Sequence, residues 1–443
     1  MAGVVDEVTD LLQGLIRNGC VNDGTPASGQ EIRSTDLLAA HLHGCGLEMS
    51  TFESLPGRAS LTARLRGTDP SAPALLLMGH TDVVPVDPAG WQRDPFAGDL
   101  VDGVVWGRGA IDMLNLTASM AVATRRIAKS GRRLRGDLVF LAVADEEAGG
   151  RLGAGWLAAN ARDAVRCDYV ITENGGVLQH APGGERVNVT VGEKGVFWCR
   201  LRVRGTPGHG SRPLRSDNAL VKAAAVVTRL AGYRPAAHIT DSWRRWVEGM
   251  GFSDDVAAAL LDPARIWEGL DRLPDAFARM SHALTHMTVS PNVMHGGEKT
   301  NVIPGHVDLE VDIRKVPGQT DEDVLELFDG ALGSLRDEVE ITVIQRDEPS
   351  ESPSDTPLWD AINRAALAVY PEARCIPTLT PGGTDARYFR ALGVPAYGMA
   401  LYSRAMTLEQ FSAMFHANDE RVDQESLRLT AELYQAVAHD LLG

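Results

Sequence analysis

A continuous apolar run that ends abruptly in polar residues constrains this chain most. Residues 75–78 read Leu-Leu-Leu-Met, and after Gly79 the run ends in His80-Thr81-Asp82. An uninterrupted apolar segment of this length is typical of a strand buried on both faces, as in the centre of a parallel or mixed sheet. Open α/β sheets bind their ligands where such strands end. We therefore expect His80 and Asp82 at a functional edge of a central sheet.

The spacing of His80 and Asp82 also predicts how the two side chains interact. Alternation along a strand places both of them on the same side. The Asp82 carboxylate can then accept one ring N–H of His80 while the other ring nitrogen faces a metal ion, as in carboxylate–histidine–zinc arrangements. Taken alone, His80 is as readily explained as a hydrogen-bonded core histidine.

Other segments extend this pattern into an α/β fold. Residues 137–144 and 169–172 are two more apolar runs of strand length, and each is followed by acidic residues. Helical spacing marks residues 117–129 and 151–161 between them. Strands that alternate with helices predict an α/β domain. We expect a mixed central sheet with helices on both faces.

The pattern changes near residues 182–185. Residues 307–314 alternate strictly between apolar and charged side chains, which predicts a half-buried strand. The strands and helices of this region predict a small α+β domain of ferredoxin-like type, inserted into the first domain. We therefore expect a catalytic domain formed by residues 1–186 and 316–443, with an inserted lid or dimerisation domain at residues 187–315.

Composition excludes several classes of function. The chain has 443 residues and a formal net charge of −16, whereas nucleic-acid or anionic-membrane partners require a basic face. Its five cysteines are far apart and include no C-x-x-C, so neither disulfides nor thiolate zinc sites are expected. Residues 1–15 lack the features of a signal peptide, and no early apolar stretch approaches transmembrane length. We expect a cytoplasmic protein.

Metal-ligand side chains follow the apolar strands and a short strand–turn unit. These side chains are His80, Asp112, Glu147 and Glu173. Histidine and carboxylates without cysteine suit a hydrolytic zinc, cobalt or manganese site better than a structural zinc site. A single acid at a strand end is more often a solvated turn residue. A dry cluster of carboxylates, however, cannot stay ionised without cations that offset their repulsion, so we expect more than one metal ion.

The order of the motifs resembles one enzyme family. The motifs are GHTDVVP (79–85), GRGAIDM (107–113), DEEAGG (145–150), TE (172–173), GTPGHGS (205–211) and a late histidine. This order is similar to the co-catalytic di-zinc metallohydrolases that include glutamate carboxypeptidase, aminoacylase, acetylornithine deacetylase and succinyl-diaminopimelate desuccinylase. The similarity extends from about residue 9 to the C-terminus. One departure is Leu114-Asn115, where many members have Lys-Gly.

The resemblance implies two Zn²⁺ per subunit, with Co²⁺ or Mn²⁺ as substitutes. The implied ligands are His80 and Glu173 for one ion, Glu147 and His416 for the other, and Asp112 as the bridge. Asp82 would orient His80, Glu146 would be the general base, and a cis peptide bond would join Asp112 to Met113. From the residues alone, His416 could not be preferred over Cys375 or His306.

The resemblance also implies contacts to the substrate. Residues that would hold the free carboxylate of the substrate are Asn301, Arg314, Gly382 and Gly383. His209 would stabilise the tetrahedral intermediate, commonly across a dimer interface, although it is also readily explained as a turn histidine without a role. Arg314 could instead form a strand-end salt bridge with Asp312 or Glu310.

These observations predict a metal-dependent hydrolase of an amide or peptide bond beside a free carboxylate, acting on dipeptides or N-acyl amino acids. A desuccinylase or an acetylornithine deacetylase-like enzyme is the alternative. A catalytically silent metal-binding protein is a further one, against which the intact Glu146 argues. A metal-free serine or cysteine hydrolase lacks a convincing G-x-S-x-G elbow or activated cysteine. The Trp-containing residues 242–284 suggest an acyl group larger or more apolar than succinyl, and the inserted domain could form a homodimer.

Overall fold

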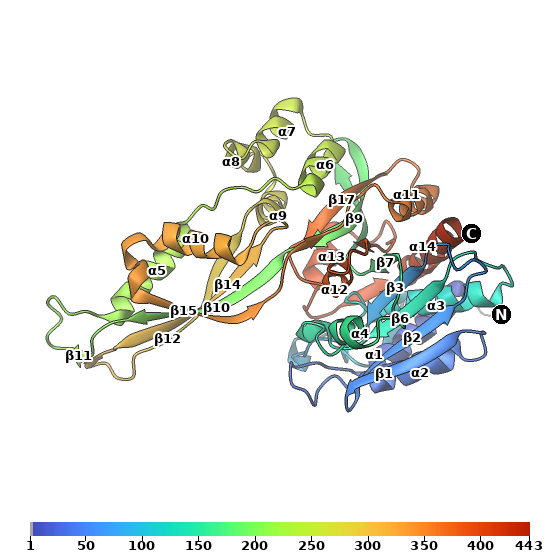
Figure 1. The fold of residues 1–443 in the computed structure, drawn as a ribbon, viewed down its shortest axis with the longest axis horizontal. Coiled ribbons are helices and arrows are strands. Elements are labelled where there is room, and N and C mark those ends of the chain that lie inside the picture. The colour runs from blue at the N-terminus through green and yellow to red at the C-terminus, as the bar shows by residue number, and fades with distance from the viewer. Residues whose placement is uncertain (1–2) are drawn as a thin grey trace.

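The computed structural model describes residues 3–443 and has two lobes. An α/β lobe lies on the right in Figure 1, and an elongated lobe built on long strands extends to the left. None of the described helices is long and apolar enough to cross a membrane. All five cysteines are free thiols.

The α/β lobe is built on one mixed sheet. Its strand order is β1-β2-β6-β3-β7-β18-β9-β16, and β8 and β17 also pair with β9. The strands are β1 (Glu48–Leu55), β2 (Arg58–Leu65), β3 (Leu75–His80), β6 (Leu138–Val143), β7 (Tyr169–Thr172), β8 (Gly175–Ala181), β9 (Gly184–Glu193), β16 (Ser350–Glu351), β17 (Arg374–Thr380) and β18 (Ala396–Gly398). β3 runs parallel to β6 and β7, whereas β2 runs antiparallel to β6. The predicted mixed sheet is confirmed.

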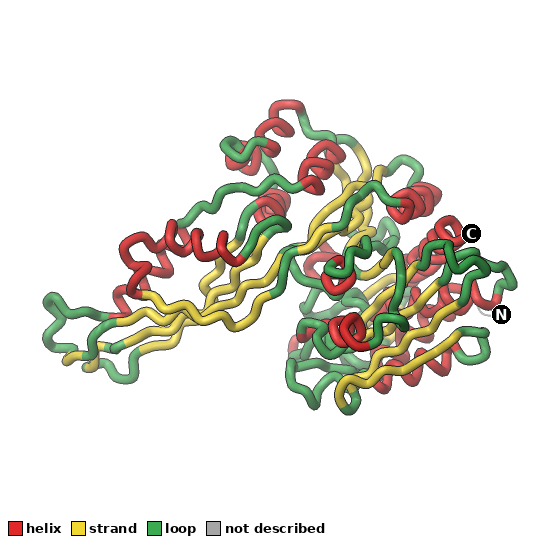
Figure 2. The backbone as a smooth tube through the Cα atoms, viewed as in Figure 1, coloured by secondary structure: helices red, strands yellow, loops and turns green. Residues whose placement is uncertain are grey.

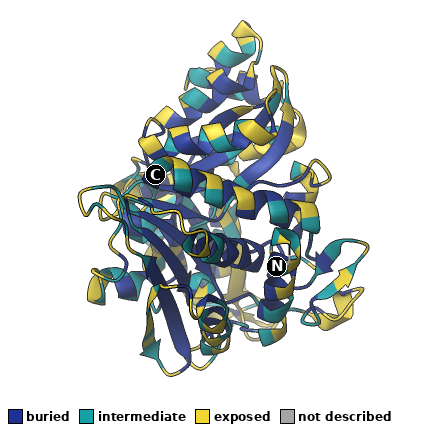
Figure 3. Ribbon diagram, turned by 90° about the vertical axis from the view of Figure 1, so that its right-hand side faces the viewer, coloured by how far each residue is buried: buried dark blue, intermediate teal, exposed yellow. Residues whose placement is uncertain are grey.

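Helices cover both faces of this sheet. They are α1 (Val4–Asn18), α2 (Ile32–Leu42), α3 (Leu114–Lys129), α4 (Ala154–Asn160), α11 (Pro357–Val369), α12 (Ala386–Arg390), α13 (Leu408–Met414) and α14 (Gln424–Leu442). Leu75 and Leu77 of β3 join the core that contains α1, α3 and α14, whereas Leu76 and Met78 join the core under α4 and α12. Successive strand residues point to opposite faces, which is why an unbroken apolar run serves both cores. Figure 3 shows these strands buried between helices whose outer faces are exposed.

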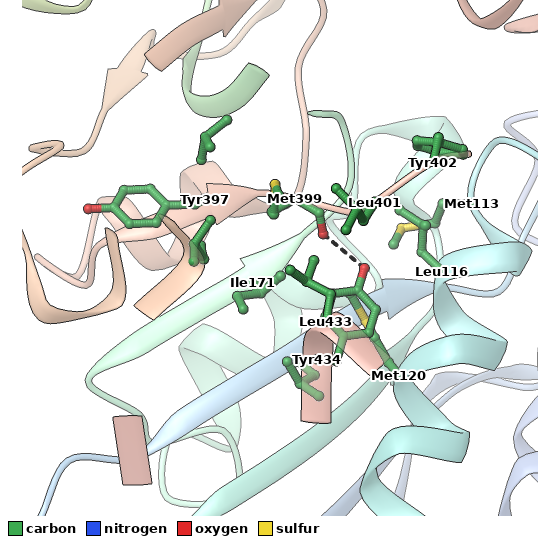
Figure 4. Close-up of a cluster of buried hydrophobic side chains, with 14 of the residues drawn as sticks. Met113, Leu116, Met120, Ile171, Tyr397, Met399, Leu401, Tyr402, Leu433 and Tyr434 are labelled. Atoms are coloured by element: carbon green, nitrogen blue, oxygen red, sulfur yellow. Dashed lines mark hydrogen bonds between the residues drawn. The ribbon is translucent and has the colours of Figure 1, made fainter. Parts of the chain in front are cut away.

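The larger core fixes the segment that follows β18. Leu116 and Met120 of α3 face Leu433 of α14 across this core (Figure 4). The Tyr434 hydroxyl donates a hydrogen bond of 2.9 Å to the Met399 carbonyl. A buried tyrosine thus keeps its polar tip satisfied, and the chain after β18 is tied to α14.

The described residues also form two small sheets. One has the order β19-β5-β4, formed by β4 (Asp99–Val101), β5 (Val104–Trp106) and β19 (Arg421–Asp423). The other pairs β11 (Gly208–His209) with β13 (Val302–Ile303) at the far tip of the elongated lobe (Figure 1). Three short 3-10 helices, η1 (Pro88–Gly90), η2 (Glu146–Ala148) and η3 (Gly333–Glu338), lie in connecting segments.

The elongated lobe contains an antiparallel four-stranded sheet with helices on one side (Figure 2). Its elements are β10 (Gly195–Arg204), α5 (Ala219–Gly232), β12 (Thr288–Gly296), β14 (His306–Lys315), α10 (Asp321–Leu332) and β15 (Val339–Arg346). The spatial order β12-β14-β10-β15 gives the β-α-β-β-α-β connectivity of ferredoxin-like units. Alternate residues of β14 are buried, as the sequence pattern predicted.

The predicted limits of this domain, residues 187 and 315, differ from the first and last residues of the four-stranded sheet. β9 belongs to the central sheet, so the inserted sheet starts at β10, which begins at residue 195. β15 pairs with β10 along its length, and α10 packs in the same apolar core. We therefore propose an inserted unit of about residues 195–347. The sequence pattern did not identify the partner of β15, because strand pairing is a long-range property.

The insertion also contains four further helices. They are α6 (Asp241–Met250), α7 (Asp254–Leu261), α8 (Ile266–Leu270) and α9 (Asp275–Thr285). Of these, α6 packs on β17 and β9 of the central sheet. Trp243 and Trp246 of α6 stack on each other, are buried, and belong to the larger core of the α/β lobe. The suggestion that this Trp-containing segment accommodates a large acyl group is therefore not supported, because these two rings are core residues.

Candidate metal centre and active site

Three neighbouring strands deliver three of the predicted ligands to one edge of the sheet. His80 is the last residue of β3, Glu173 follows β7 directly, and Glu147 lies in η2 after β6. β3 is parallel to both of its neighbours, so the carboxyl ends of all three strands meet. Residues far apart in the chain thus converge for a topological reason.

Asp112 approaches His80 because α3 packs very closely on β3. A Cβ at position 79 would overlap the Thr117 hydroxyl of α3, so this position requires glycine. The Thr117 hydroxyl donates to the His80 carbonyl at 2.7 Å. In consequence Asp112 Oδ1 lies 3.1 Å from His80 Nε2. The peptide bond from Asp112 to Met113 is cis, as the resemblance implied.

His416 joins the group through the pairing of β19 with β5. The register sets Arg421 opposite Trp106, six residues before Asp112 in the chain. His416 itself has a left-handed backbone with φ of 55°. Its Nε2 atom lies 3.2 Å from Asp112 Oδ2 and 3.2 Å from Glu147 Oε2.

These five side chains form two overlapping groups of donor atoms. The groups are His80, Asp112 and Glu173, and Asp112, Glu147 and His416; within each group the ligand atoms lie within 4.8 Å of one another. Asp112 is common to both. The Oε1 atom of Glu147 is buried and has no hydrogen-bond partner. An all-nitrogen and oxygen donor set with an unused buried carboxylate oxygen fits divalent cations.

The electrostatics of the site favour added positive charge. Burial, together with the charge of Glu173, raises the pKa of Glu146 well above its usual value. Burial and the charge of Asp112 likewise raise the pKa of Glu173 and bring that of Glu147 to about 7. Carboxyl groups in this position resist ionisation together unless cations balance them.

The pKa values of the two histidines also indicate that the site favours positive charge. Hydrogen bonds to Asp112 and Glu147 raise the pKa of His416 to about 10. Burial opposes a charge on His80, yet the hydrogen bond to Asp112 and the surrounding carboxylates raise its pKa as well. Burial also works against ionisation of Asp112, but its bonds to both imidazoles hold its pKa below the usual value. The raised pKa values of both imidazoles indicate that the surrounding carboxylates favour positive charge at this site.

Asp82 interacts with His80 differently from the prediction. The His80 Nδ1 atom lies 2.9 Å from the main-chain carbonyl oxygen of Asp82, and the Asp82 carboxylate is 3.6 Å away. This carboxylate instead accepts the backbone N–H groups of Glu146 and Glu147, at 3.2 and 3.1 Å. β3 ends at His80, so strand alternation does not extend to residue 82. Asp82 therefore holds the turn that carries Glu146 and Glu147.

A buried layer behind this turn was not predicted. Arg58 makes hydrogen bonds to both carboxylate oxygens of Glu31 and, at 2.8 Å, to Asp145. Asn22 donates to Asp82 at 2.8 Å and lies 3.4 Å from Asp145. Asp145 precedes the two glutamates and has a left-handed backbone, with φ of 73°. The sequence carries no periodic signal that links residues 22, 31 and 58 to this turn.

Glu146 itself lies beside the ligand groups. Its Oε2 atom is 4.0 Å from His80 Nε2. Further along the same segment, Arg387 donates to the Gly149 carbonyl at 2.6 Å and to the Thr384 carbonyl at 2.9 Å. The loop that contains Gly382 and Gly383 therefore adjoins the turn of the predicted base.

The predicted residues of the inserted domain are not gathered at this site. His209 is exposed at the far tip of the elongated lobe, where its Nδ1 atom lies 2.8 Å from the Ser211 hydroxyl (Figure 1). The Asn301 carbonyl accepts the Gly210 N–H beside it. Arg314 donates to Asp312 at 2.7 Å, the salt bridge that the sequence left open.

The last missed residue is Glu420, four positions after His416. It is fully buried and paired with Arg108 at 2.9 Å. Arg108 lies within the GRGAIDM motif (107–113), but neither the charge pattern nor the spacing connected it to Glu420.

Known proteins share both the sequence pattern and the fold. Residues 76–440 match the model of peptidase family M20/M25/M40. Aminoacylase-1 of Mus musculus is 27% identical over 424 residues, 94% of this chain and 90% of that protein. A succinyl-diaminopimelate desuccinylase of Stenotrophomonas maltophilia (strain K279a) is 31% identical over 376 residues, 84% of each chain. The crystal structure of an M20 family metallo-carboxypeptidase of Sulfolobus solfataricus superposes with a TM-score of 0.75 at 19% identity, covering 100% of this chain and 99% of that one.

Proposed function

The chain belongs to peptidase family M20/M25/M40, hydrolases of amide and peptide bonds, and we propose that it cleaves such a bond beside a free carboxylate with two bound zinc ions. The proposed substrates are dipeptides or N-acyl amino acids. A succinyl-diaminopimelate desuccinylase or an acetylornithine deacetylase-like activity is the alternative. A desuccinylase is as similar in sequence to this chain as aminoacylase-1 is.

One observation carries this proposal. Two groups of three donor atoms share Asp112, as a pair of bridged cations would require. We assign His80 and Glu173 to one cation and Glu147 and His416 to the other. When bound, such a pair supplies Lewis acidity that lowers the pKa of a coordinated water towards neutrality.

Glu146 is the proposed general base. Its carboxylate stands at the edge of the donor groups, and its backbone N–H is held by Asp82. A carboxylate within reach of a coordinated water can take its proton and act as a general base. The same Glu146 oxygen then returns this proton to the leaving amine.

The carboxylate of the substrate needs a positive partner on an acidic protein. We assign this role to Arg314 and Asn301, with the loop of Gly382 and Gly383 as a further contact. Arg314 is paired with Asp312 in the structure, so a substrate carboxylate would have to displace or share that partner. A planar guanidinium suits a bidentate carboxylate.

His209 is proposed to donate to the tetrahedral intermediate from a second copy of the chain. β11, which ends in His209, lies at the tip of the elongated lobe and away from the α/β lobe that holds the donor groups (Figure 1). A homodimer formed through the inserted unit would allow the histidine of one subunit to serve the other.

The proposal is tested with Glu146→Gln. Because the amide cannot take up the proton, turnover of N-acyl amino acids should fall by about 10²–10⁴-fold. The bound metal, measured by atomic absorption, should remain that of the wild type. Glu372→Gln changes an exposed residue of the same lobe and should leave turnover and metal content unchanged.

The substrate class is tested with matched acids and amides. The C-terminal amide of each N-acyl amino acid or dipeptide should be turned over far more slowly than the acid. Wild-type turnover by Glu146→Gln would remove this residue from the mechanism, and equal rates for acid and amide would rule out recognition of the carboxylate.

A further inference from the structure

Glu420 is a buried carboxylate that no part of the proposed reaction uses. Its residue is 0% exposed, and it immediately precedes β19. A buried carboxylate is costly unless it is paired and hydrogen-bonded. Its partners therefore indicate what it holds in place.

Both carboxylate oxygens of Glu420 bind the segment that leads to Asp112. Oε1 accepts the backbone N–H groups of Ile111 and Asp112, at 2.6 and 2.8 Å. Oε2 accepts the backbone N–H of Gly109 at 3.0 Å and an Arg108 guanidinium N–H at 2.9 Å. Four donors from a single turn thus converge on one side chain.

The same residue is joined to His416 by the chain itself and by Arg108. The second guanidinium nitrogen of Arg108 lies 3.4 Å from the His416 carbonyl oxygen. The Glu420 carbonyl accepts the Gly107 N–H at 2.9 Å. His416 and Asp419 both have left-handed backbones, a conformation that non-glycine residues keep only when their surroundings hold them there.

We propose that Glu420 is a positioning residue that fixes the separation between Asp112 and His416, and thereby the affinity for the cation that these two residues share with Glu147. The inference rests on the proposed metal centre. Asp112 is held from behind through its own N–H, and His416 is held through the loop of which Glu420 is the last residue. Partners behind metal ligands commonly change metal affinity 10–100-fold when they are removed.

A charged carboxylate is required here for a geometric reason. Each oxygen of Glu420 faces two N–H donors. In Glu420→Gln one oxygen becomes an NH₂ group, which must face donors on that side. The turn of Ile111 and Asp112, or that of Arg108, must then move away, although the volume of the side chain is unchanged.

The test is zinc binding to metal-free protein, measured by competition with a chromophoric chelator. Wild type should bind two Zn²⁺. Because Asp112 belongs to both donor groups, Glu420→Gln should bind at least one of the two ions about 10–100-fold more weakly. Glu425→Gln is the matched control, because Glu425 is exposed and paired only on the surface with Arg428; both affinities should remain those of wild type.

The outcomes separate this inference from the function it rests on. If wild type binds fewer than two ions, the proposed metal centre is wrong. If wild type binds two and Glu420→Gln binds both equally well, only the positioning role is overturned. Should circular dichroism show that Glu420→Gln is unfolded, Glu420→Asp takes its place, because it keeps the charge but shortens the reach. Unchanged affinity for both ions in that folded variant would refute the role as well.

Discussion

Replacing Arg58 by methionine should destabilise the α/β lobe by about 3–5 kcal/mol, the usual cost of removing one partner from a buried ion pair. The Arg58 residue is 1% exposed and binds two carboxylates, Glu31 and Asp145. Methionine fills much of the same space but leaves both carboxylates without their cation. Stabilities of whole domains are about 5–15 kcal/mol, so the expected loss is a large fraction of the total.

Arg66 provides the matched control. It lies one residue beyond β2, the strand that Arg58 begins, and its side chain is 61% exposed while it pairs with Glu48 and Asp137. Exposed ion pairs contribute only about 0–1 kcal/mol. Arg66→Met should therefore cost no more than this amount, although it removes the same type of charge.

Urea unfolding of the metal-free proteins measures the difference. A chain with two lobes need not unfold in one step, so far-UV circular dichroism and tryptophan fluorescence should be followed together. Arg58→Lys should fall between wild type and Arg58→Met, because an ammonium keeps the charge but not the fork of donors. If Arg58→Met and Arg66→Met lower the free energy of unfolding by the same amount, the buried ion pairs of Arg58 do not contribute the stability assigned to them.

Three further predictions follow from buried charges, the metal centre and the far tip. Burial lowers the pKa of Lys194 to about 7, so between pH 7 and 10 the unfolded chain holds a proton that the folded chain lacks. Wild-type stability relative to Lys194→Met should then rise with pH, by up to about 1.4 kcal/mol per unit, and a constant difference in urea midpoints would contradict this. Exhaustive chelation should abolish hydrolysis and lower the melting temperature, and Zn²⁺, Co²⁺ or Mn²⁺ should restore both; full activity without metal would refute the mechanism. His209→Ala and Glu146→Gln should each be inactive but regain activity when mixed and allowed to exchange subunits, whereas no recovery would argue against a histidine supplied in trans.

The parts of the fold that local patterns encode were predictable. The apolar run at 75–78 indicated a central strand, and the alternation at 307–314 indicated a half-buried one; the structure has both as β3 and β14. The convergence of His80, Glu147 and Glu173 followed from strand ends in a parallel arrangement. Each of these depends on periodicity or on the end of a strand.

What depends on long-range pairing was not predictable from the residues. His416 reaches Asp112 through a three-residue strand and a left-handed turn, and neither leaves a periodic signal. The resemblance to a family supplied that residue instead. The predicted hydrogen bond from His80 to the Asp82 carboxylate was wrong, because β3 ends at His80 and strand alternation does not reach residue 82. The pairing of β15 with β10, on which the proposed end of the inserted unit rests, had no local signal either.

β18 has a consequence for how the chain is made. This strand, residues 396–398, lies between β7 and β9 and pairs with both. Before residues 396–398 have been synthesised, the strands from β1 to β7 and the strands around β9 cannot be joined into one sheet. Each of these two parts then has an exposed edge strand, and exposed edge strands promote aggregation. Newly synthesised chains should therefore depend on chaperone protection until late in translation, and premature termination upstream of residue 396 should yield products that proteases remove.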